Sequence, residues 1–358
     1  MAKNDRYQRQ MILPGFGLAA QEKLLAAKVL IVGMGGLGCP VLQYLTGAGV
    51  GHIGIMDADR ISLSNLHRQI LFNESEIGFL KVDRAAEKMR LLNADVNIET
   101  YPFQLSQSNA LEILSKYDLV IDATDNFPAK YLINDACIVA QKPFVFGAVS
   151  RYEGQVSVFN LATLEKRLIN YRDVFPVAPP PGEVPGCAEA GVMGALPGII
   201  GTMQAAEAIK IITAIGNPLH GRLYHYNLLQ GQGYEIDISS SENKTVMNEK
   251  IFLENVYDVK EDEADVPEIS VTEFKRLMKL PGVFVLDVRE RHEYPSIDFA
   301  DAQIPMSELQ TKMHEIPEKE ICIICHQGIR SLYAAQQITK QRNLTVYSLK
   351  GGLTAYFK

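Results

Sequence analysis

Three glycines near the N-terminus, Gly33, Gly35 and Gly38, have the spacing of a turn that could bind a phosphate group. They follow the apolar run 29–32 and precede a segment with proline in its first turn, which predicts a strand, a glycine turn and a helix. Such glycines let the backbone approach a phosphate closely, and the start of the helix offers N–H groups to an anion. A second apolar run ends at Asp57, where a carboxylate is expected to meet a ribose hydroxyl. The pattern predicts a nucleotide site.

Charged and amide side chains follow other expected strands. Asn65 and Arg68 come after the second strand, Lys81 opens a helix, and Asp125 follows the fourth strand. Ligands bind beyond the carboxyl ends of the strands in an open α/β sheet, so we expect these side chains near the glycine turn. A carboxylate that faces phosphates needs a cation between them, so Asp125 suggests Mg²⁺. Taken alone, a helix cap is favoured for Asp125 and a surface charge for Lys81. The set of residues together favours a polyphosphate site.

Two cysteines lie in segments that could carry sulfur chemistry. Cys187 ends a proline-rich stretch, and a buried role and a chemical role are equally open for it. Cys325 follows an apolar strand in a loop that contains Gly328 and closes with Arg330 at a helix start. The N–H groups of such a turn form an anion nest, and Arg330 and the helix end would favour a thiolate. Cys325 is therefore predicted to be a sulfur nucleophile or persulfide carrier, and Cys322 a core residue.

The elements that must position these residues alternate between strand and helix. Strands are expected at 28–32, 52–56, 97–101, 118–121 and 143–149, and helices at 38–48, 81–93, 108–116 and 128–140. This alternation predicts an α/β fold with a Rossmann-like, mostly parallel sheet and helices on both of its faces. The later runs 155–159 and 222–226 alternate in polarity and suggest antiparallel strands.

A second, smaller α/β unit is expected toward the C-terminus. An acidic stretch predicts a linker at 241–267 between a first domain at 1–240 and a second at 268–358. In the second domain, strands are expected at 283–287, 321–324 and 345–347, and helices at 270–279, about 306–314, and 330–340.

The bulk composition is that of a globular protein. The chain has 358 residues, enough for two domains, and 47% of them are hydrophobic. A formal net charge of −7 argues against a broad nucleic-acid surface. Five cysteines without a regular framework suggest a reducing compartment, and no apolar run predicts a signal peptide or a membrane span. We therefore expect a cytoplasmic protein that binds neither nucleic acid nor membrane.

Together these motifs resemble those of a known family. Residues 5–240 are similar to the adenylyltransferases of the ubiquitin-activating superfamily, especially the bacterial MoeB and ThiF type that activates the sulfur carriers of molybdopterin and thiamin synthesis. The matching residues are 6–10, 33–38, Asp57, 64–68, Lys81, 124–126 and 187–192. Residues 268–358 resemble a rhodanese domain through 286–289, the Cys325 loop and 349–352. The chain thus resembles a fused adenylyltransferase and sulfurtransferase.

The resemblance implies ATP and Mg²⁺ as cofactors and a small ubiquitin-like sulfur-carrier protein as partner. In the family, the C-terminal Gly-Gly carboxylate of the carrier attacks the α-phosphate and pyrophosphate leaves. The nucleotide site expected here comprises Gly33, Gly35, Gly36, Gly38, Asp57, Ser64, Asn65, Arg68, Lys81, Asp125 and Asn126.

The resemblance also gives roles to three further residues. Arg9 matches an arginine that reaches the active site of the other subunit in a homodimer. The acyl-adenylate would meet a persulfide on Cys325, loaded by a sulfur donor such as a cysteine desulfurase. Cys187 could form a covalent or disulfide link that releases the thiocarboxylate.

The chain departs from its relatives at two places. Many relatives bind structural zinc through two Cys-x-x-Cys pairs, but 170–173 and 245–248 contain no cysteine here, so we expect no structural zinc. The loop after Cys325 has His326 and Gln327 where relatives often have arginine, which leaves the sulfur donor open.

Three alternatives compete with this interpretation. An NAD(P)-binding oxidoreductase would use the same glycine turn, but it does not explain the set of Asn65, Arg68, Lys81 and Asp125. A cysteine phosphatase generally has five residues between its cysteine and arginine, whereas four separate Cys325 from Arg330. A non-catalytic scaffold that only binds the carrier would not need Arg9, Arg68, Lys81 and Asp125, all of which are present here.

Overall fold

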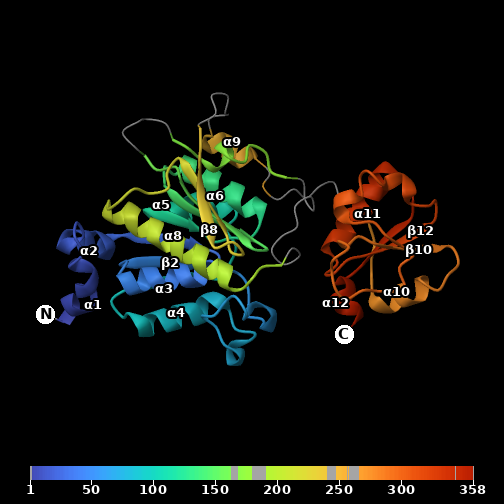
Figure 1. The fold of residues 1–358 in the computed structure, drawn as a ribbon, viewed down its shortest axis with the longest axis horizontal. Coiled ribbons are helices and arrows are strands. Elements are labelled where there is room, and N and C mark those ends of the chain that lie inside the picture. Colours follow the sequence, from blue (N-terminus) through green and yellow to red (C-terminus); the bar gives the residue numbers. More distant parts are fainter. Residues whose placement is uncertain are drawn as a thin grey trace. The chain divides into compact units, whose positions relative to one another are not determined.

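The computed structural model describes residues 2–162, 168–179, 191–239, 247–255, 257, 266–342 and 344–357. The chain divides into two compact units (Figure 1). The described part of the N-terminal unit ends at Tyr257, and that of the C-terminal unit, apart from Pro179, begins at Val266. Cys187 lies outside the described residues.

The N-terminal unit is built on an eight-stranded sheet of order β3-β2-β1-β4-β5-β6-β7-β8. Its strands are β1 Lys28–Val32, β2 His52–Met56, β3 Asn97–Tyr101, β4 Leu119–Asp122, β5 Phe144–Ser150, β6 Glu153–Phe159, β7 Arg222–Asn227 and β8 Gln232–Asp237. The first five are parallel and the last three antiparallel. Strands β1, β2 and β4 are buried along almost their whole length, as continuous apolar runs in a parallel sheet require. The predicted sheet, including its antiparallel strands, is confirmed.

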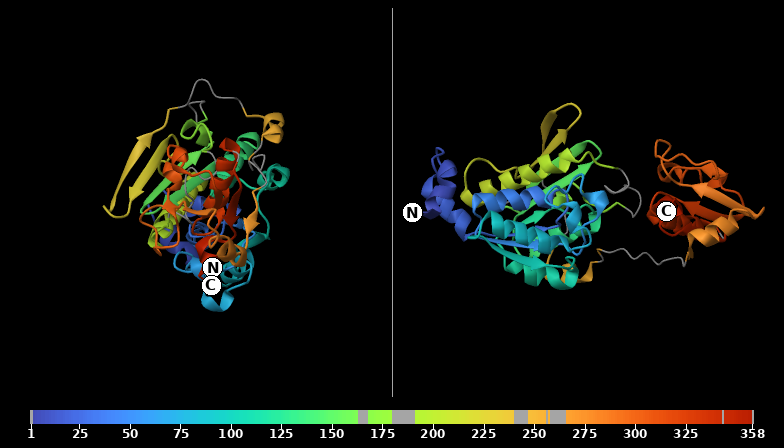
Figure 2. Two further views of the ribbon diagram at one scale, coloured as in Figure 1. Left: turned by 90° about the vertical axis from the view of Figure 1, so that its right-hand side faces the viewer. Right: turned by 90° about the horizontal axis from the view of Figure 1, so that it is seen from below.

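Helices cover both faces of this sheet, as predicted (Figure 1). They are α1 Ala2–Met11, α2 Gly17–Ala26, α3 Gly38–Ala48, α4 Lys81–Leu92, α5 Gln107–Ser115, α6 Phe127–Val139, α8 Ala195–Thr213 and α9 Glu249–Glu254, with short 3₁₀ turns η1 Leu63–Asn65, η2 Glu74–Glu76 and η3 Tyr171–Asp173. The core on one face includes residues of α2, α3, α4 and α8, and the core on the other includes residues of α5, α6 and α9. Strands β7 and β8, yellow in Figure 2, form a hairpin that extends beyond these helices. No helix in the described ranges is long and apolar enough to cross a membrane.

The stretch expected to be a linker contains a packed element. Helix α9 lies within the range 241–267, and its Phe252 is fully buried in the core with α5 and α6. The described residues up to Tyr257 therefore belong to the N-terminal unit.

The C-terminal unit contains a five-stranded parallel sheet of order β11-β10-β12-β13-β9. Its elements are β9 Glu268–Ile269, α10 Val271–Leu277, β10 Val283–Asp287, β11 Ala302–Gln303, η4 Met306–Glu308, η5 Met313–Glu315, β12 Glu320–Ile324, α11 Ile329–Gln341, β13 Val346–Leu349 and α12 Gly352–Tyr356. The helix expected at about 306–314 is wrong, because this stretch makes the two separate turns η4 and η5. The Thr311 hydroxyl donates to the carbonyl oxygen of Glu308 (2.9 Å), a local bond that competes with a continuous helix.

Candidate functional site

The glycine turn connects β1 to α3 in a conformation that requires glycine. Gly33 has φ +100°, and its N–H donates to the carbonyl oxygen of Met56 at the end of β2 (2.8 Å). A β-carbon at Gly33 would lie 2.6 Å from the carbonyl oxygen of Ala123, and one at Gly38 would lie 1.9 Å from that of Gly33. At Gly35 the nearest atom to a β-carbon would be 3.8 Å away. The turn is therefore tight on its inner side and open at Gly35, as close approach of a phosphate requires.

Asp57 and Lys81 lie beside this turn, at the carboxyl end of β2. The Asp57 carboxylate accepts hydrogen bonds from the backbone N–H of Met34 and of Asp59, both at 2.7 Å. The Lys81 ammonium group lies 2.8 Å from Asp59 Oδ2 and 3.8 Å from Asp57 Oδ2. Burial raises the pKa of Asp57, and the Lys81 charge opposes this shift. Asp57 thus fixes the glycine turn directly. Asp59, which the sequence analysis did not single out, orients Lys81. Its position two residues after Asp57 is the one sequence feature that could have indicated this role.

The loop that carries Ser64, Asn65 and Arg68 packs against the glycine turn. A β-carbon at Gly36 would lie 3.3 Å from the carbonyl oxygen of Arg68 and 2.9 Å from the side chain of Pro197 in α8. The Arg68 guanidinium donates to the carbonyl oxygen of Ser64 (3.2 Å). The loop is therefore held between the turn and the start of α8, and its donors lie next to the predicted phosphate site.

Asp125 lies on the other side of the turn, in the loop after β4. The preceding residue, Thr124, is fixed by Asp122, which accepts from its hydroxyl (2.6 Å) and pairs with Lys130 (3.1 Å). Asn126 caps α6 through its side-chain oxygen. Asp125 itself is exposed, and its carboxylate has no hydrogen-bond or ion-pair partner within the described part of the chain. Its oxygens are thus free for a cation, whereas the Asn126 oxygen already serves as a helix cap.

A buried lysine that sequence reasoning missed holds this loop in place. Besides Asp122, Lys130 donates to the carbonyl oxygens of Thr124 (2.9 Å) and Gly147 (2.8 Å), and it is almost fully buried. Gln204 of α8 donates to the carbonyl oxygen of Asp122 (2.8 Å). Both residues are buried, and nothing in their sequence spacing marks them.

The residues present suit a Mg²⁺ ion that is bound partly by phosphates and water better than a metal ion bound by protein side chains alone. Among the described residues, no group of three or more His, Cys, Asp or Glu side chains could hold a metal ion. Mg²⁺ commonly binds through one or two carboxylates plus phosphates and water, which suits a single free Asp125. At the place of the relatives' zinc ligands, Asn170 and Asp173 each accept a backbone hydrogen bond within η3, and Asn248 caps α9.

Arg9 is not brought to the glycine turn of its own chain. It is exposed on α1, and the neighbouring Tyr7 is buried against the far end of α3, where a β-carbon at Gly49 would meet its ring. Tyr7 also accepts a hydrogen bond from Asn93 at the end of α4 (2.8 Å). Helix α3 has 11 residues, which places α1 roughly 16 Å along the helix from the turn.

The second candidate centre is the loop after β12 in the C-terminal unit. Cys325 is buried, and its sulfur accepts from the backbone N–H of Gly328 (3.1 Å) and lies 3.4 Å from the hydroxyl of Ser331. Gly328 has φ +92° and immediately precedes α11. A β-carbon at Gly352 would lie 2.4 Å from the carbonyl oxygen of Cys325. The Ser331 hydroxyl accepts from the Cys325 thiol and itself donates to the carbonyl oxygen of Gly328 (3.0 Å), so the donor to the sulfur is the backbone N–H of Gly328, as in a turn that receives an anion.

Arg330 has a partner other than the cysteine. Its guanidinium donates to both oxygens of Glu293, at 2.6 and 2.8 Å. Burial by itself raises the pKa of Glu293, but the hydrogen bonds from Arg330 and from the N–H of Glu290 hold that pKa below its ordinary value. Much of the positive charge expected to favour a Cys325 thiolate is therefore neutralised by Glu293.

Cys322 lies three residues before Cys325 but belongs to the core. It is fully buried with residues of α10 and α12, and burial raises the pKa of its thiol to about 12. The two cysteines have opposite surroundings because successive side chains of β12 alternate between the faces of the sheet.

Two family profiles together match most of the chain. The ThiF family matches residues 7–247, and the rhodanese-like domain matches residues 270–358. The chain is 36% identical over 362 residues to the probable adenylyltransferase/sulfurtransferase MoeZ of Mycobacterium tuberculosis, covering 99% of this chain and 92% of MoeZ. It is 35% identical to adenylyltransferase and sulfurtransferase MOCS3 of Arabidopsis thaliana, covering 98% and 82%.

Two further similarities concern the N-terminal unit. A sulfur carrier protein adenylyltransferase of Thermus thermophilus is 52% identical over 227 residues, which is 63% of this chain and 84% of that protein. A crystal structure of E. coli MccB with AMPCPP and MccA aligns with a TM-score of 0.60 at 21% identity, covering 68% of this chain and 74% of that one. The latter likeness concerns the fold alone.

Proposed function

The chain belongs to the ThiF family and carries a rhodanese-like domain, and on that premise we propose that it activates a sulfur-carrier protein with ATP and converts it to a thiocarboxylate. It is an adenylyltransferase with a sulfurtransferase domain. The observation that carries the proposal is the gathering of the glycine turn, the Asp57–Lys81 pair and the Asp125 loop at one edge of the sheet. An oxidoreductase would not need these charges around the turn.

In the proposed adenylation, the turn from Gly33 to Gly38 receives the phosphates of ATP and Asp57 binds near the ribose. Arg68 and Lys81 offset the negative charge that gathers as a carboxylate oxygen of the carrier attacks the α-phosphorus and pyrophosphate leaves. Positioning and charge supply most of the catalysis in such a transfer. Mg²⁺, when bound, would neutralise phosphate charge, and Asp125 is the residue that would hold it.

The proposed assembly is a homodimer in which Arg9 serves the site of the other subunit. The support is its place at the far end of α3, which keeps it away from the glycine turn of its own chain. Co-expression of Arg9→Ala and Asp125→Ala chains tests this. Half of the random dimers would be mixed, each with one complete site, giving about a quarter of the unaltered activity. If Arg9 acts within its own chain, or not at all, the mixture does not show this recovery above the activity of the separate variants.

In the proposed sulfur transfer, the outer sulfur of a persulfide on Cys325 attacks the carbonyl carbon of the carrier adenylate. The bond to AMP breaks, AMP leaves with the electron pair, and an acyl disulfide joins the carrier to Cys325. A Cys187 thiolate then attacks the Cys325 sulfur, which releases the carrier thiocarboxylate and leaves a Cys187–Cys325 disulfide for a dithiol reductant. A sulfur donor such as a cysteine desulfurase would reload Cys325.

Two assays on the unaltered protein test this function. A small carrier protein that ends in Gly-Gly is expected to support ATP–pyrophosphate exchange, and a carrier without its last glycine is not. With a persulfide donor present, mass spectrometry is expected to detect the carrier with its terminal oxygen replaced by sulfur. Exchange that is independent of any carrier, or reduction of NAD by the protein, would contradict the proposal.

A further inference from the structure

Two buried serines lie next to Cys325, and no step of the proposed sulfur transfer uses them. Ser331 is in the first turn of α11 and Ser348 is in β13, and both side chains are fully buried. Ser331 Oγ lies 3.4 Å from Cys325 Sγ, and the Ser348 hydroxyl donates to Ser331 Oγ (2.9 Å). The sulfur therefore stands at the end of a chain of hydrogen bonds that leads into the core of the C-terminal unit.

The hydroxyl of Ser331 uses all of its hydrogen-bonding capacity. Its oxygen accepts from the Cys325 thiol and from Ser348, and its hydrogen is donated to the carbonyl oxygen of Gly328 (3.0 Å). A serine hydroxyl has one hydrogen and two lone pairs, so no position is left over. The Gly328 carbonyl oxygen also accepts from the backbone N–H of Leu332 (3.2 Å), so it does not depend on Ser331 alone.

Loss of the proton from Cys325 changes what the Ser331 hydroxyl can do. An anionic sulfur no longer donates, but it can accept a second hydrogen bond besides the one from Gly328. The Ser331 hydrogen can then turn from the Gly328 carbonyl to the sulfur, because Leu332 still donates to that carbonyl and Ser348 still donates to Ser331. Hydrogen bonds to ionised groups are roughly twice as strong as neutral ones, so the turn is favourable. No buried polar group loses its last partner.

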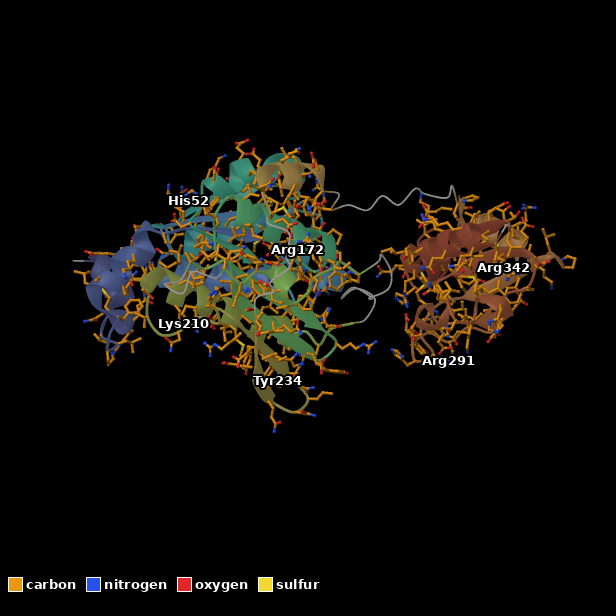
Figure 3. All side chains as sticks on the ribbon, turned by 90° about the horizontal axis from the view of Figure 1, so that it is seen from above. His52, Arg172, Lys210, Tyr234, Arg291 and Arg342 are labelled. Atoms are coloured by element: carbon orange, nitrogen blue, oxygen red, sulfur yellow. The ribbon has the colours of Figure 1, made fainter. Side chains whose placement is uncertain are left out.

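The elements that carry the two serines are fixed by contacts away from the sulfur. At the end of α11, Arg342, labelled in Figure 3, donates to the carbonyl oxygens of Met313 (3.2 Å) and Ile316. Strand β13 pairs with β12 on one side and with β9 on the other, and the N–H of Ser348 donates to the carbonyl oxygen of Pro267 (3.1 Å). A turn of the hydroxyl hydrogen therefore needs no movement of the backbone.

We propose that Ser331 is a catalytic residue of sulfur transfer, whose hydroxyl donates to Cys325 Sγ when negative charge returns to that sulfur, and that Ser348 is its positioning residue. This inference rests on the role proposed above for Cys325. The charge returns when an acceptor takes the outer sulfur of the persulfide. A bond forms between the acceptor and the outer sulfur, the S–S bond breaks, and its electron pair stays on Sγ. Ser331 keeps its proton throughout and only redirects it.

The experiment compares two reactions of the same persulfide in the full chain. Thiosulfate loads Cys325: its outer sulfur passes to the thiolate, sulfite leaves, and the small molecules are removed by desalting. Cyanide then takes the outer sulfur as thiocyanate and returns the electron pair to Sγ. Iodoacetamide instead alkylates the outer sulfur and releases iodide, so Sγ receives no charge. Both rates are measured in single turnovers, by thiocyanate release and by mass spectrometry of the Cys325 peptide.

The two reactions are expected to respond differently to loss of the Ser331 hydroxyl. A hydrogen bond to a charged group is lost only in the cyanide reaction, so Ser331→Ala is expected to slow it about 10- to 100-fold. Alkylation of the outer sulfur is expected to keep its unaltered rate. Ser348→Ala leaves the Ser331 oxygen without its donor, and is expected to slow the cyanide reaction roughly 2- to 10-fold with alkylation unchanged.

The matched control removes another hydroxyl that is bonded to the same loop. The Thr354 hydroxyl donates to the carbonyl oxygen of His326 (2.9 Å), and the Thr354 N–H donates to the same oxygen (3.0 Å). Thr354→Val therefore leaves that carbonyl with a partner and does not touch the sulfur. Both the cyanide and the alkylation rates are expected to stay unchanged.

Equal slowing of both reactions in Ser331→Ala overturns the inference, because a displaced loop affects cyanide and iodoacetamide alike. An unchanged cyanide rate overturns it as well. If Ser331→Ala does not fold, Ser348→Ala decides: selective slowing of the cyanide reaction supports the inference, and equal or absent slowing refutes it. Failure of the proposed function gives a different result, because thiocyanate release would then persist in Cys325→Ala.

Discussion

Gly38 and Gly33 are in contact across the glycine turn, with no room for a side chain between them. A β-carbon at Gly38 would lie 1.9 Å from the carbonyl oxygen of Gly33, far inside van der Waals contact. Since that oxygen is backbone, the turn itself would have to move. The shape of the turn therefore depends on the absence of a β-carbon at Gly38.

This contact predicts opposite effects for two substitutions in α3. Gly38→Ala is expected to destabilise the N-terminal unit and to abolish ATP binding, because the turn is displaced. Gly47→Ala meets no atom within 4 Å and is expected to stabilise the helix by about 0.5–1 kcal/mol with ATP binding retained. Urea unfolding and isothermal titration with ATP measure the two effects. Equal ATP affinity in both variants would contradict this account of the turn.

The free carboxylate of Asp125 predicts a strict requirement for this residue in adenylation. Asp125→Ala removes the proposed Mg²⁺ ligand without removing any hydrogen bond of the folded chain, so stability is expected to be unchanged. Carrier-dependent pyrophosphate exchange is expected to fall at least 100-fold, about 3 kcal/mol in transition-state stabilisation. Asp83→Asn, an exposed change in the first turn of α4, is the control and should retain exchange. Exchange at the unaltered rate in Asp125→Ala would rule out the assigned role.

Cys325 and Cys322 are expected to differ in chemistry although they are close in sequence. Cys325→Ala should retain pyrophosphate exchange and lose thiosulfate:cyanide sulfur transfer. Cys322→Ala should retain both activities and lose stability instead, because it leaves a small cavity in the core. Persulfide labelling followed by mass spectrometry is expected to mark Cys325 alone. Sulfur transfer that persists in Cys325→Ala would place the sulfur carrier elsewhere.

The Glu293–Arg330 pair predicts a pH dependence of stability in the C-terminal unit. A carboxylate whose pKa is lowered by folding contributes stability above its unfolded-state pKa and loses it as the pH falls through its folded-state pKa. Glu293→Gln is therefore expected to destabilise this unit by about 3 kcal/mol at neutral pH. The difference from the unaltered chain should shrink as the pH is lowered below about 4.5.

Pulse proteolysis in urea, followed through C-terminal fragments of the full chain, measures this difference at each pH. Glu273→Gln is the control, because its partner Arg276 is at the surface and little change is expected at any pH. A difference between Glu293→Gln and the unaltered chain that stays constant down to about pH 3 would exclude ionisation of Glu293 as its cause.

Structural zinc is expected to be absent from this chain. Asn170 and Asp173 stand where the resemblance implies the first pair of zinc ligands, and their side chains cap η3. Chelator treatment is therefore expected to leave both the melting temperature and the pyrophosphate exchange of Mg²⁺-restored protein unchanged. Stoichiometric zinc in chelator-washed protein, measured by atomic emission, would contradict this prediction.

The sequence by itself determined the order of the elements and much of the candidate nucleotide site. Continuous apolar runs such as 29–32 predict buried parallel strands, because both faces of such strands are covered. The spacing of the glycines from Gly33 to Gly38 predicts a tight turn between a strand and a helix. Asp57 and Asp125 then follow strands whose carboxyl ends meet at one edge of the sheet, so their proximity to the turn could be predicted.

Tertiary structure decided the partners of the charged side chains, because these come from segments far apart in sequence. Gln204 of α8 donates to the carbonyl oxygen of Asp122, 82 residues away, and so helps to fix the loop that carries Asp125. Glu293 takes up the guanidinium of Arg330, 37 residues away, and alters the charge near the candidate sulfur site. Tyr257 reaches Asp135 across 122 residues. Hydrophobic periodicity records which face of an element is buried, but it carries no information about which buried charge meets which, and only packing settles that choice.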